Sequence, residues 1–368
     1  MEDITAEIGD GIHATPVYDD NGTFYFVNGN NISEYGITIT ATTQKVTEEE
    51  ALKNNASALN SNSILLSING TIGNVALYKN EPIMLGKSAC YINVSSNANR
   101  NYIFYYLMMP KCQFYFISEL TGTTIKNLSL KSVRKTKVLL PNAKEQNKIA
   151  RLFDVINERI ATQSKVIEDL KKLKCAIIET EYNGKGHEYR IGDIIEQTSL
   201  RNKNNLIKTV LSVNNKLGFI SQDEQFEDRT VASEDTSNYK VVTINDFAYN
   251  PARINVGSIA RLKSFDKGIV SPMYICFKVT DGIVPEYLES YFATNLFFKE
   301  MQKRLEGSVR LCLSFEGLCN IPIVIPCIDE QTKIGKQIRL LESKIENECN
   351  VLSLYEKQKL YLLRQMFI

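Results

Sequence analysis

Apolar residues recur every three or four positions along two long stretches of this chain, one from Pro141 to Tyr182 and one from Pro326 to the last residue. This spacing places the apolar side chains on one face, so each stretch is predicted to form an amphipathic helix. About 40 residues in helical conformation span roughly 60 Å, long enough to pair with another helix along a continuous seam. The apolar positions of the first stretch are Ile149, Leu152, Phe153, Ile156, Ile160, Val166, Ile167, Leu170, Leu173 and Ile177.

The two stretches are copies of one another at a shift of 185 residues, because 326 − 141 = 185. An internal repeat of this length indicates that the chain consists of two copies of one unit. Both copies open with a proline, which suits the first turn of a helix. The matched pairs are Pro141/Pro326, Glu145/Glu330, Gln146/Gln331, Lys148/Lys333, Ile149/Ile334 and Ile160/Ile345.

The predicted helix-pairing seam contains both apolar and polar positions. Lys174 matches Lys359 and Gln163 matches Glu348 at the same shift, and polar seam residues can fix the register of a helix pair. The alternative interpretation is two unrelated surface helices. The apolar seam residues are Ile149, Ile156, Ile160, Leu170 and Ile177 in the first helix and Ile338, Ile345, Leu352 and Leu362 in the second.

Short strand patterns bounded by turn signals fill the remainder of the chain. Predicted strands cover residues 23–27, 64–67, 75–78, 138–140, 241–244, 269–270 and 323–325, and predicted helices cover 102–109 and 287–304. The fold class is therefore mixed α/β, with two globular domains separated by two long antiparallel helices and related by an internal pseudo-two-fold repeat. The predicted boundaries are residues 1–140 for domain 1, 141–183 for helix 1, 184–325 for domain 2 and 326–368 for helix 2.

Composition narrows the class of protein further. A net charge of +1 excludes a strongly basic protein, although a basic face can be balanced elsewhere on the molecule. No apolar run approaches 18 residues and the chain opens without a signal peptide, so no membrane or export role is expected. The eight cysteines form no C-x-x-C pair and there are two histidines, which argues against a zinc site and favours reduced cysteines in the cytoplasm.

Motifs of catalysis are incomplete. Asn250-Pro251 resembles the start of an adenine-methyltransferase motif, but the second proline and the aromatic residue are missing. Gly86-Lys87-Ser88 resembles the end of a P-loop, but Glu81 occupies the position of the first glycine. Asp329 with Glu342-Ser343-Lys344 resembles a nuclease pattern only loosely, and neither His13 nor His187 has a partner at catalytic spacing.

Several weaker motifs occur in a specific order along almost the whole chain. The first half contains Gly9-Asp10-Gly11-Ile12-His13-Ala14-Thr15-Pro16, Ile72-Gly73 and Gly122-Thr123-Thr124, and the second contains Val210-Leu211-Ser212-Val213-Asn214, Ser237-Asn238-Tyr239, Tyr249-Asn250-Pro251 and Val256-Gly257-Ser258-Ile259. Together with the repeated P-x-x-x-E-Q helix start, this order resembles the specificity subunit of type I DNA restriction–modification systems. One departure is that Tyr189-Arg190-Ile191-Gly192-Asp193-Ile194 introduces the second domain, whereas the first begins almost directly at Asp3-Ile4. The opening strand of domain 1 is therefore either incomplete or supplied differently.

The resemblance implies a DNA-reading subunit without catalytic activity. Each domain would read one half of a split target in double-stranded DNA, and the paired helices would set the spacing and bind two methyltransferase (modification) subunits. Restriction (translocase–nuclease) subunits would join that core. S-adenosylmethionine, ATP and Mg would be cofactors of those partners, and this chain would need none.

Side chains suited to DNA binding are frequent in the predicted loops, since amides and Arg read base edges while Lys and Arg bind phosphates. The basic run Lys126, Lys131, Arg134, Lys135 and Lys137 either contacts phosphates or forms a solvated strand edge. Asn28, Asn30 and Asn31 are either base readers or turn residues. The candidate DNA-binding residues are His13, Asn28, Asn30, Asn31, Thr123, Thr124, Lys126, Lys131, Arg134 and Lys135 in domain 1, and Arg201, Lys203, Asn214, Asn215, Lys216, Asn250, Arg253, Asn255, Ser308 and Arg310 in domain 2.

Two other functions fit parts of the same pattern. One is a scaffold that joins partner subunits through globular ends that bind protein. The other is a recognition module with its own active site, against which the incomplete catalytic motifs argue.

Overall fold

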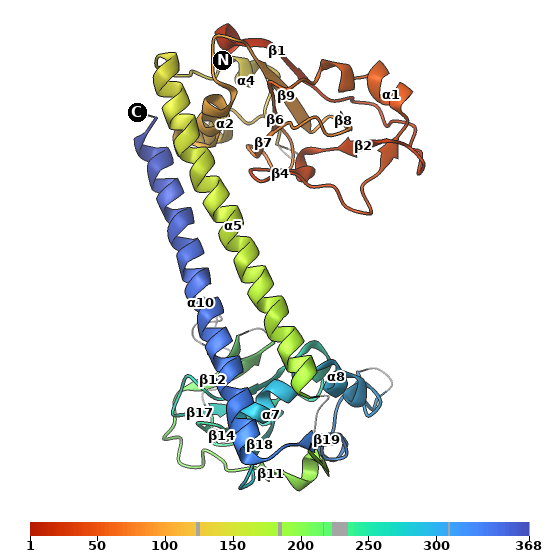
Figure 1. Ribbon diagram of the computed structural model, residues 1–368, viewed down its shortest axis with the longest axis vertical. Helices are drawn as coiled ribbons and strands as arrows, with labels where there is room; N and C mark the ends of the chain where they lie inside the picture. The colour runs from red at the N-terminus through yellow and green to blue at the C-terminus, as the bar shows by residue number, and fades with distance from the viewer. Residues whose placement is uncertain (123–125, 183–185, 216, 223–234, 308–309, 368) are drawn as a thin grey trace. The chain divides into compact units, whose positions relative to one another are not determined.

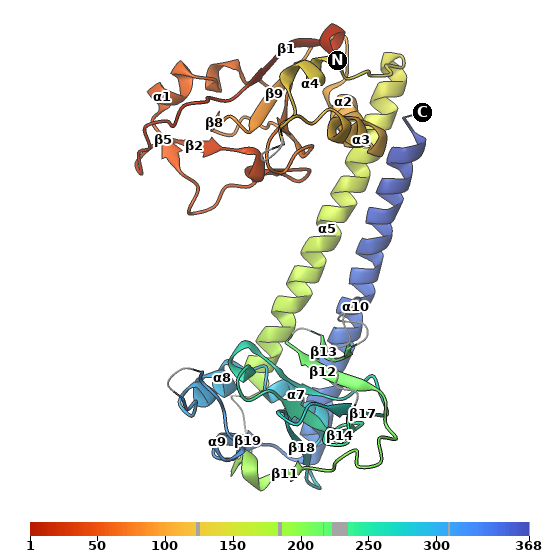
Figure 2. The ribbon, with the colours of Figure 1, turned by 180° about the vertical axis from the view of Figure 1, so that it is seen from behind.

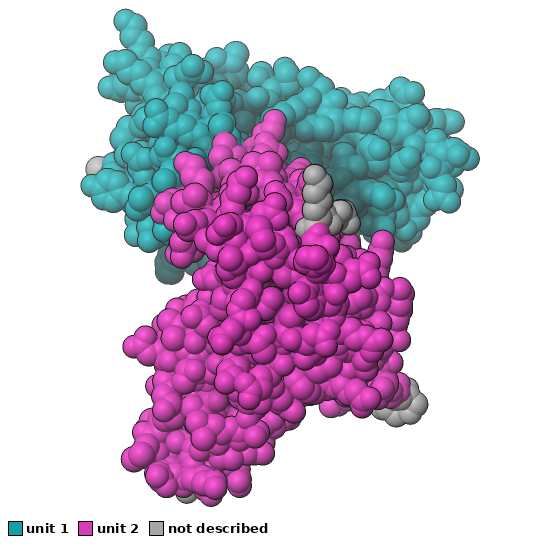
Figure 3. Space-filling view, turned by 60° about the horizontal axis from the view of Figure 1, so that its bottom comes forward, with its two compact units in different colours: residues 1–164, 350–368 teal, residues 165–349 magenta. Residues whose placement is uncertain are grey.

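The computed structural model describes residues 1–367 except 123–125, 183–185, 216, 223–234 and 308–309. The chain forms two compact units, coloured separately in Figure 3. Unit 1 consists of Met1–Ser164 and Asn350–Ile368, and unit 2 of Lys165–Cys349. Each unit thus contains a globular part, the first half of one long helix and the second half of the other. The division into compact units falls inside the two long helices, at residues 164/165 and 349/350. It therefore does not bear on the predicted domain boundaries at residues 140 and 325, which stay predictions.

The described residues of unit 1 form nine short strands, four short helices and parts of both long helices. Figure 1 shows their arrangement. Its strands are β1 (Thr5–Asp10), β2 (Phe24–Val27), β3 (Ile32–Ser33), β4 (Gly36–Ile37), β5 (Lys45–Val46), β6 (Ser63–Ser67), β7 (Val75–Leu77), β8 (Ile83–Leu85) and β9 (Ala89–Val94). Its helices are α1 (Glu48–Lys53), α2 (Arg100–Met108), α3 (Pro110–Ser118), α4 (Leu130–Lys135) and the first half of α5 (Ala143–Glu181), with the 3-10 turns Glu2–Ile4, Gly29–Asn31 and Ala56–Ala58.

Unit 2 contains the remaining elements. Its strands are β10 (His187–Arg190), β11 (Ile195–Thr198), β12 (Val210–Asn214), β13 (Gly218–Ser221), β14 (Lys240–Thr243), β15 (Phe247–Tyr249), β16 (Ile259–Arg261), β17 (Lys267–Val270), β18 (Ile275–Val279) and β19 (Pro322–Ile325). Its helices are α7 (Pro285–Tyr291), α8 (Asn295–Gln302), α9 (Phe315–Cys319) and the first half of α10 (Ile328–Gln365), with the 3-10 turns Ile191–Asp193 and Ile254–Val256. The mixed α/β class is confirmed.

One sheet has the same strand order in both units. In unit 1 the order is β1-β9-β6-β7, and in unit 2 it is β11-β18-β15-β16, with antiparallel neighbours throughout. The pairing Ile64–Ile92 in unit 1 corresponds to Phe247–Phe277 in unit 2. In each unit this sheet belongs to the apolar core that also includes the adjacent short helices and both long helices. The repeat seen in the sequence is therefore a repeat of this core.

The second sheet differs between the units. Both contain a parallel pair, β2 with β8 and β12 with β17. In unit 1 the flanking antiparallel strand β5 joins β2, whereas in unit 2 β13 joins β12 and β14 joins β17. The two units thus share the core beside the helices and diverge in the layer built on it.

The repeated glutamine of the helix start has a structural role. Gln146 and Gln331 are buried, and each donates to the carbonyl of the proline five residues earlier, at 2.8 and 3.0 Å. Their side-chain oxygens accept from the backbone amides of Asn99 and Val284, at the first turns of α2 and α7. The P-x-x-x-E-Q motif therefore attaches each long helix to the short helix of its own unit. Both helices begin two residues after the proline, and Asn142 accepts from the Glu145 amide at 3.1 Å.

Aromatic residues at the ends of the long helices fill equivalent places in the two units. Phe367 lies 5.2 Å from Tyr102 and 5.6 Å from Tyr106 in unit 1, between ring centroids. In unit 2 Tyr182 lies 4.7 Å from Tyr287 and 5.6 Å from Tyr291. All these positions correspond at the shift of 185. Each unit thus encloses the end of the long helix that starts in the other repeat.

The seam residues lie as follows within the units. Ile156 and Ile160 are buried in the unit 1 core, where Ile149, Leu352 and Leu362 are partly buried, and Ile338 is buried in the unit 2 core. Leu170, Ile177 and Ile345 are partly buried. The first half of α5 packs with the second half of α10 in unit 1, and the reverse holds in unit 2, so the two helices run antiparallel within each unit (Figures 1 and 2).

Three predictions from the sequence are wrong in detail. Leu152, Val166 and Leu173 are 38%, 38% and 48% exposed, because a straight helix turns these positions away from the seam that Phe153 and Ile167 face. Residues 138–140 are not a strand. Their counterpart β19 is paired by β10, and the described residues of unit 1 contain no such partner. Residues 287–304 form two helices, α7 and α8, because the Thr294 hydroxyl accepts from the Phe297 amide and caps a new helix.

Candidate nucleic-acid interface

A closed loop recurs just before the end of the globular part in each unit. In unit 1 the backbones of Thr121 and Asn127 exchange two hydrogen bonds of 3.0 and 2.9 Å, and in unit 2 Glu306 and Cys312 do so at 2.9 and 2.8 Å. The glycine after the first bridge residue has a positive φ in both, 93° at Gly122 and 115° at Gly307. A Cβ on Gly307 would lie 2.3 Å from the Arg310 carbonyl oxygen, so the closed loop requires glycine there.

In unit 2 this loop lies next to two other segments that contain candidate residues. The Leu313 amide donates to the Pro251 carbonyl at 3.1 Å, which attaches the loop to the turn at 250–258 between β15 and β16. A Cβ placed on Gly257 would lie 3.6 Å from Cβ of Asn215, so that turn packs against the tip of the β12–β13 hairpin. Arg253, Asn215 and Arg310 are exposed. The structure therefore brings three candidate segments to one edge of unit 2.

The asparagine side chains on this edge differ in their exposure and in the hydrogen bonds they make within their own turns. The Asn250 side chain accepts from the Ala252 amide at 3.1 Å, and the Asn214 side chain accepts from the Leu217 amide at 3.1 Å. Asn255 is half-buried. Asn214 and Asn250 therefore shape their turns, and the exposed Asn215, Arg253 and Arg310 are the side chains best placed to contact a ligand.

Unit 1 gathers the corresponding segments. The Leu128 amide donates to the Ile68 carbonyl at 2.8 Å, next to the turn between β6 and β7. Thr71 of that turn donates to the Gly29 carbonyl at 2.8 Å, which brings in the turn after β2. Lys126 and Asn30 are exposed on this edge.

Asn28 and Asn31 act as turn residues. The Asn31 side-chain oxygen accepts from the Asn28 amide at 3.0 Å, and its nitrogen donates to the Thr38 carbonyl at 3.0 Å. The Asn28 side chain accepts from Ser88 at 2.9 Å. Of the three asparagines that the sequence left open, only Asn30 is exposed. His13 is exposed as well, and its ring lies 2.9 Å from the Asp10 carboxylate.

Other candidates lie outside these edges or outside the described residues. Lys131 and Lys135 are exposed on α4, and Arg134 of the same helix donates to the Ile8 carbonyl at 2.7 Å. These three members of the basic run therefore lie on a helix and not on a strand edge, whereas Lys126 and Lys137 lie outside it. Arg201 donates to the Asn238 carbonyl, and Lys203 is exposed on the segment between β11 and β12. The candidates Thr123, Thr124, Lys216 and Ser308 are not among the residues that the structure describes.

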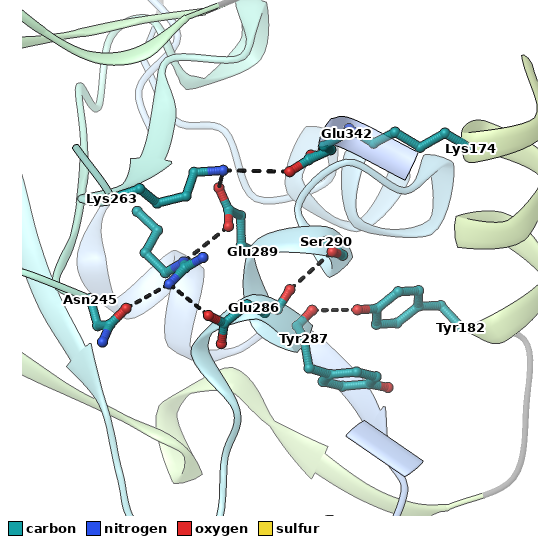
Figure 4. Close-up of polar contacts among 10 residues, drawn as sticks. Lys174, Tyr182, Asn245, Lys263, Glu286, Tyr287, Glu289, Ser290 and Glu342 are labelled. Carbon is teal, nitrogen blue, oxygen red and sulfur yellow. Dashed lines mark hydrogen bonds and ion pairs between the residues drawn. The ribbon is translucent and has the colours of Figure 1, made fainter. Parts of the chain in front are cut away.

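A chain of ion pairs in unit 2 was not expected from the sequence (Figure 4). Lys174 of α5 lies 2.6 Å from Glu342 of α10, and Lys263 lies 3.8 Å from Glu342 and 2.7 Å from Glu289 of α7. Arg261 of β16 is 3.0 Å from Glu289, and its side chain is 7% exposed. The only signal in the sequence was the charge of single helix positions, whose pairing depends on the register.

The neighbouring cations stabilise the negative charge of Glu342. Burial alone would raise the pKa of its carboxyl, but the hydrogen bond from Lys174 and the charges of Lys174, Lys263 and Arg261 outweigh burial and lower the pKa below the ordinary value of 4.5. Glu342 is therefore ionised at neutral pH. Its carboxylate is a half-buried partner of Lys174 and Lys263.

Across the described part of the chain, no three His, Cys, Asp or Glu side chains gather in a way that could hold a metal ion. Among the same residues, no helix has both the length and the apolar character needed to cross a membrane.

Known proteins resemble this chain in part of its sequence and in its fold. Residues 12–172 match a family model described as "Type I restriction modification DNA specificity domain". The S subunit of a type I restriction–modification system from M. genitalium has a TM-score of 0.61 at 17% identity, over 100% of this chain and 94% of that chain. A chain from a structure on complex assembly and conformational transition of the type I R-M system has a TM-score of 0.57 at 12% identity, over 100% and 96%. At such identities the two structures show a shared fold.

Proposed function

We propose that this chain is the DNA-reading subunit of a type I restriction–modification system. The family match over residues 12–172 confirms the resemblance to the specificity subunits of such systems. Unit 1 and unit 2 each read one half of a split target in double-stranded DNA. The globular parts are the target-recognition domains, and the antiparallel helices α5 and α10 separate them and set the gap between the half-sites.

The observation that supports this proposal is the recurrence of one edge in both units. The same sheet order and the same two-bond closed loop occur twice. The side chains on that edge nevertheless differ, with Asn30 and Lys126 exposed in unit 1 and Asn215, Arg253 and Arg310 exposed in unit 2. A common frame with different exposed amides and guanidinium groups is what two readers of different sequences require.

Catalysis belongs to partner subunits in this proposal. Two methyltransferase subunits bind along the helices, with S-adenosylmethionine as their cofactor, and restriction subunits add ATP- and Mg-dependent cleavage. The chain has no reaction of its own in this proposal, which the incomplete methyltransferase and P-loop motifs and the pairing of Glu342 with lysines support. The complex acts in the cytoplasm, where it meets DNA.

The test is selection from random duplexes by the chain in complex with its methyltransferase subunit. We expect enrichment of a motif with two specified halves and an unspecified gap. A scaffold without DNA reading would bind the methyltransferase subunit but enrich no motif, and that result would refute the proposal.

A further inference from the structure

Unit 2 contains a continuous path of ion pairs from both long helices to the sheet that supports its hairpin. Lys174 on α5 pairs with Glu342 on α10, which also pairs with Lys263, two residues after β16. Lys263 pairs in turn with Glu289 on α7, and Glu289 pairs with Arg261 on β16. Figure 4 shows Lys263 between the carboxylates of Glu289 and Glu342. Arg261 is also 3.1 Å from Glu286 and donates to the Asn245 side chain at 2.5 Å, so its guanidinium is held on several sides.

The strand at the end of this path supports the β12–β13 hairpin. Ser258, immediately before β16, is buried and donates to the Val213 carbonyl of β12 at 3.2 Å. A hollow of about 290 Å³ between these elements is lined by Asn214, Asn215, Lys174, Lys263 and Glu342, among others. The hairpin tip and the ion pairs therefore face the same space.

The described residues of unit 1 carry a different set of charges at the corresponding place. At the shift of 185, Glu342, Glu289 and Glu286 correspond to Asn157, Phe104 and Asn101. In unit 1, Asn157 donates to the Tyr105 hydroxyl at 3.0 Å, and that hydroxyl donates to Asp154 at 2.8 Å. Lys359, the counterpart of Lys174, forms an ion pair with Glu34 in unit 1. The continuous path of ion pairs in unit 2 is thus replaced in unit 1 by this single pair and by hydrogen bonds among Asn157, Tyr105 and Asp154.

We propose that Lys263, with Glu289 and Glu342, is a positioning residue that holds the β12–β13 hairpin in the orientation in which unit 2 reads its half-site. The inference rests on the proposed function. Lys263 acts through Glu289, Arg261 and the strand β16, and it joins the orientation of the hairpin tip to the two long helices. A change in the path should therefore alter sequence discrimination in one half of the target only.

The test compares Lys263→Met, which breaks the path, with Lys263→Arg, which keeps the charge. Lys263 is 43% exposed, so neither change leaves a cavity in the core. The matched control is Lys79→Met, because Lys79 follows Leu77 of β7 by two residues, as Lys263 follows Arg261, and no side-chain ion pair is formed by Lys79 among the described residues. The measurement is competition binding of the complex with duplexes that have one base pair changed in either half.

We expect Lys263→Met to reduce discrimination in the unit 2 half by about tenfold, within the range of one base-pair mismatch. Discrimination in the other half should stay within twofold, and amide hydrogen exchange should become faster in the hairpin tip, at Asn214 and Leu217. Lys263→Arg should restore both readouts, and Lys79→Met should change neither.

Three results would overturn the inference: unchanged discrimination in Lys263→Met, equal loss in both halves, or failure of Lys263→Arg to restore it. A wild-type complex that reads a split motif while Lys263→Met reads it equally well removes this inference and leaves the proposed function standing. A wild-type complex with no motif removes both.

Discussion

Replacing the aromatic side chain at the end of each long helix should destabilise one unit and spare the other. Phe367 is 4% exposed, and its ring centroid lies 5.2, 5.6 and 5.8 Å from those of Tyr102, Tyr106 and Phe153, all in unit 1. Truncating a buried Phe to Ala costs about 3–5 kcal/mol, and three aromatic neighbours favour the upper part of this range. We therefore expect Phe367→Ala to reduce the stability of unit 1 by about 4 kcal/mol, a large part of the ~5–15 kcal/mol that holds a domain folded.

Hydrogen exchange measured by mass spectrometry separates the two units. Each 1.4 kcal/mol changes an equilibrium tenfold, so the slowest amides of unit 1 should exchange about a thousandfold faster in Phe367→Ala. Tyr182→Ala should produce the corresponding change in unit 2, because Tyr182 packs on Tyr287 and Tyr291 there. Met366→Ala is the control, since Met366 is 36% exposed. Acceleration below tenfold, or equal acceleration in both units from Phe367→Ala, would refute the assignment of helix ends to units.

Three further perturbations test other parts of the structure. Ile156→Asp places a charge at a site that is 6% exposed in the unit 1 core, so thermal unfolding should show the loss of that unit. A small shift of the melting temperature would instead place Ile156 at the surface. Lys131→Gln with Lys135→Gln should weaken binding to all duplexes alike and flatten the plot of log K against log salt by about 0.9 for each phosphate contact removed; a changed motif would instead show base reading. The pKa of Glu342 is lowered, so its ion pairs stabilise unit 2 fully above the ordinary value of 4.5 and lose this effect as pH falls through the lowered pKa. The stability difference between wild type and Glu342→Gln should accordingly shrink on acidification, and a difference that grows would contradict the assigned pairing.

Repetition was the most informative property of the sequence. The match of Gln146 with Gln331 predicted an equivalent place in two helices, and both side chains make the same hydrogen bonds in the structure. The break between α7 and α8 was also present in the repeat, because Asn295 corresponds to Pro110, which begins α3. Periodicity alone gave a continuous helix there, since a Thr cap is a weaker signal than a proline.

Other features depended on contacts that a single sequence does not contain. Residues 138–140 have a strand composition, but a strand forms only where a partner supplies hydrogen bonds. Asn28 and Asn31 have side chains that can either read bases or cap a turn, and only the positions of Ser88 and Thr38 distinguish these roles. The Lys174–Glu342 pair required the register of two helices, which a period of 3.6 residues does not fix.

The methylated motif of cells that contain this chain and its methyltransferase partner tests the central claim most directly. Wild type and the variants Arg253→Ala, Arg310→Ala and Lys126→Ala would be compared by sequencing methylated positions across the genome. We predict a split motif in which Arg253→Ala and Arg310→Ala relax one half, at about 1–3 kcal/mol for each lost base contact, and Lys126→Ala leaves that half intact. Relaxation of both halves by a substitution in unit 2 would contradict the account, as would a motif without a gap.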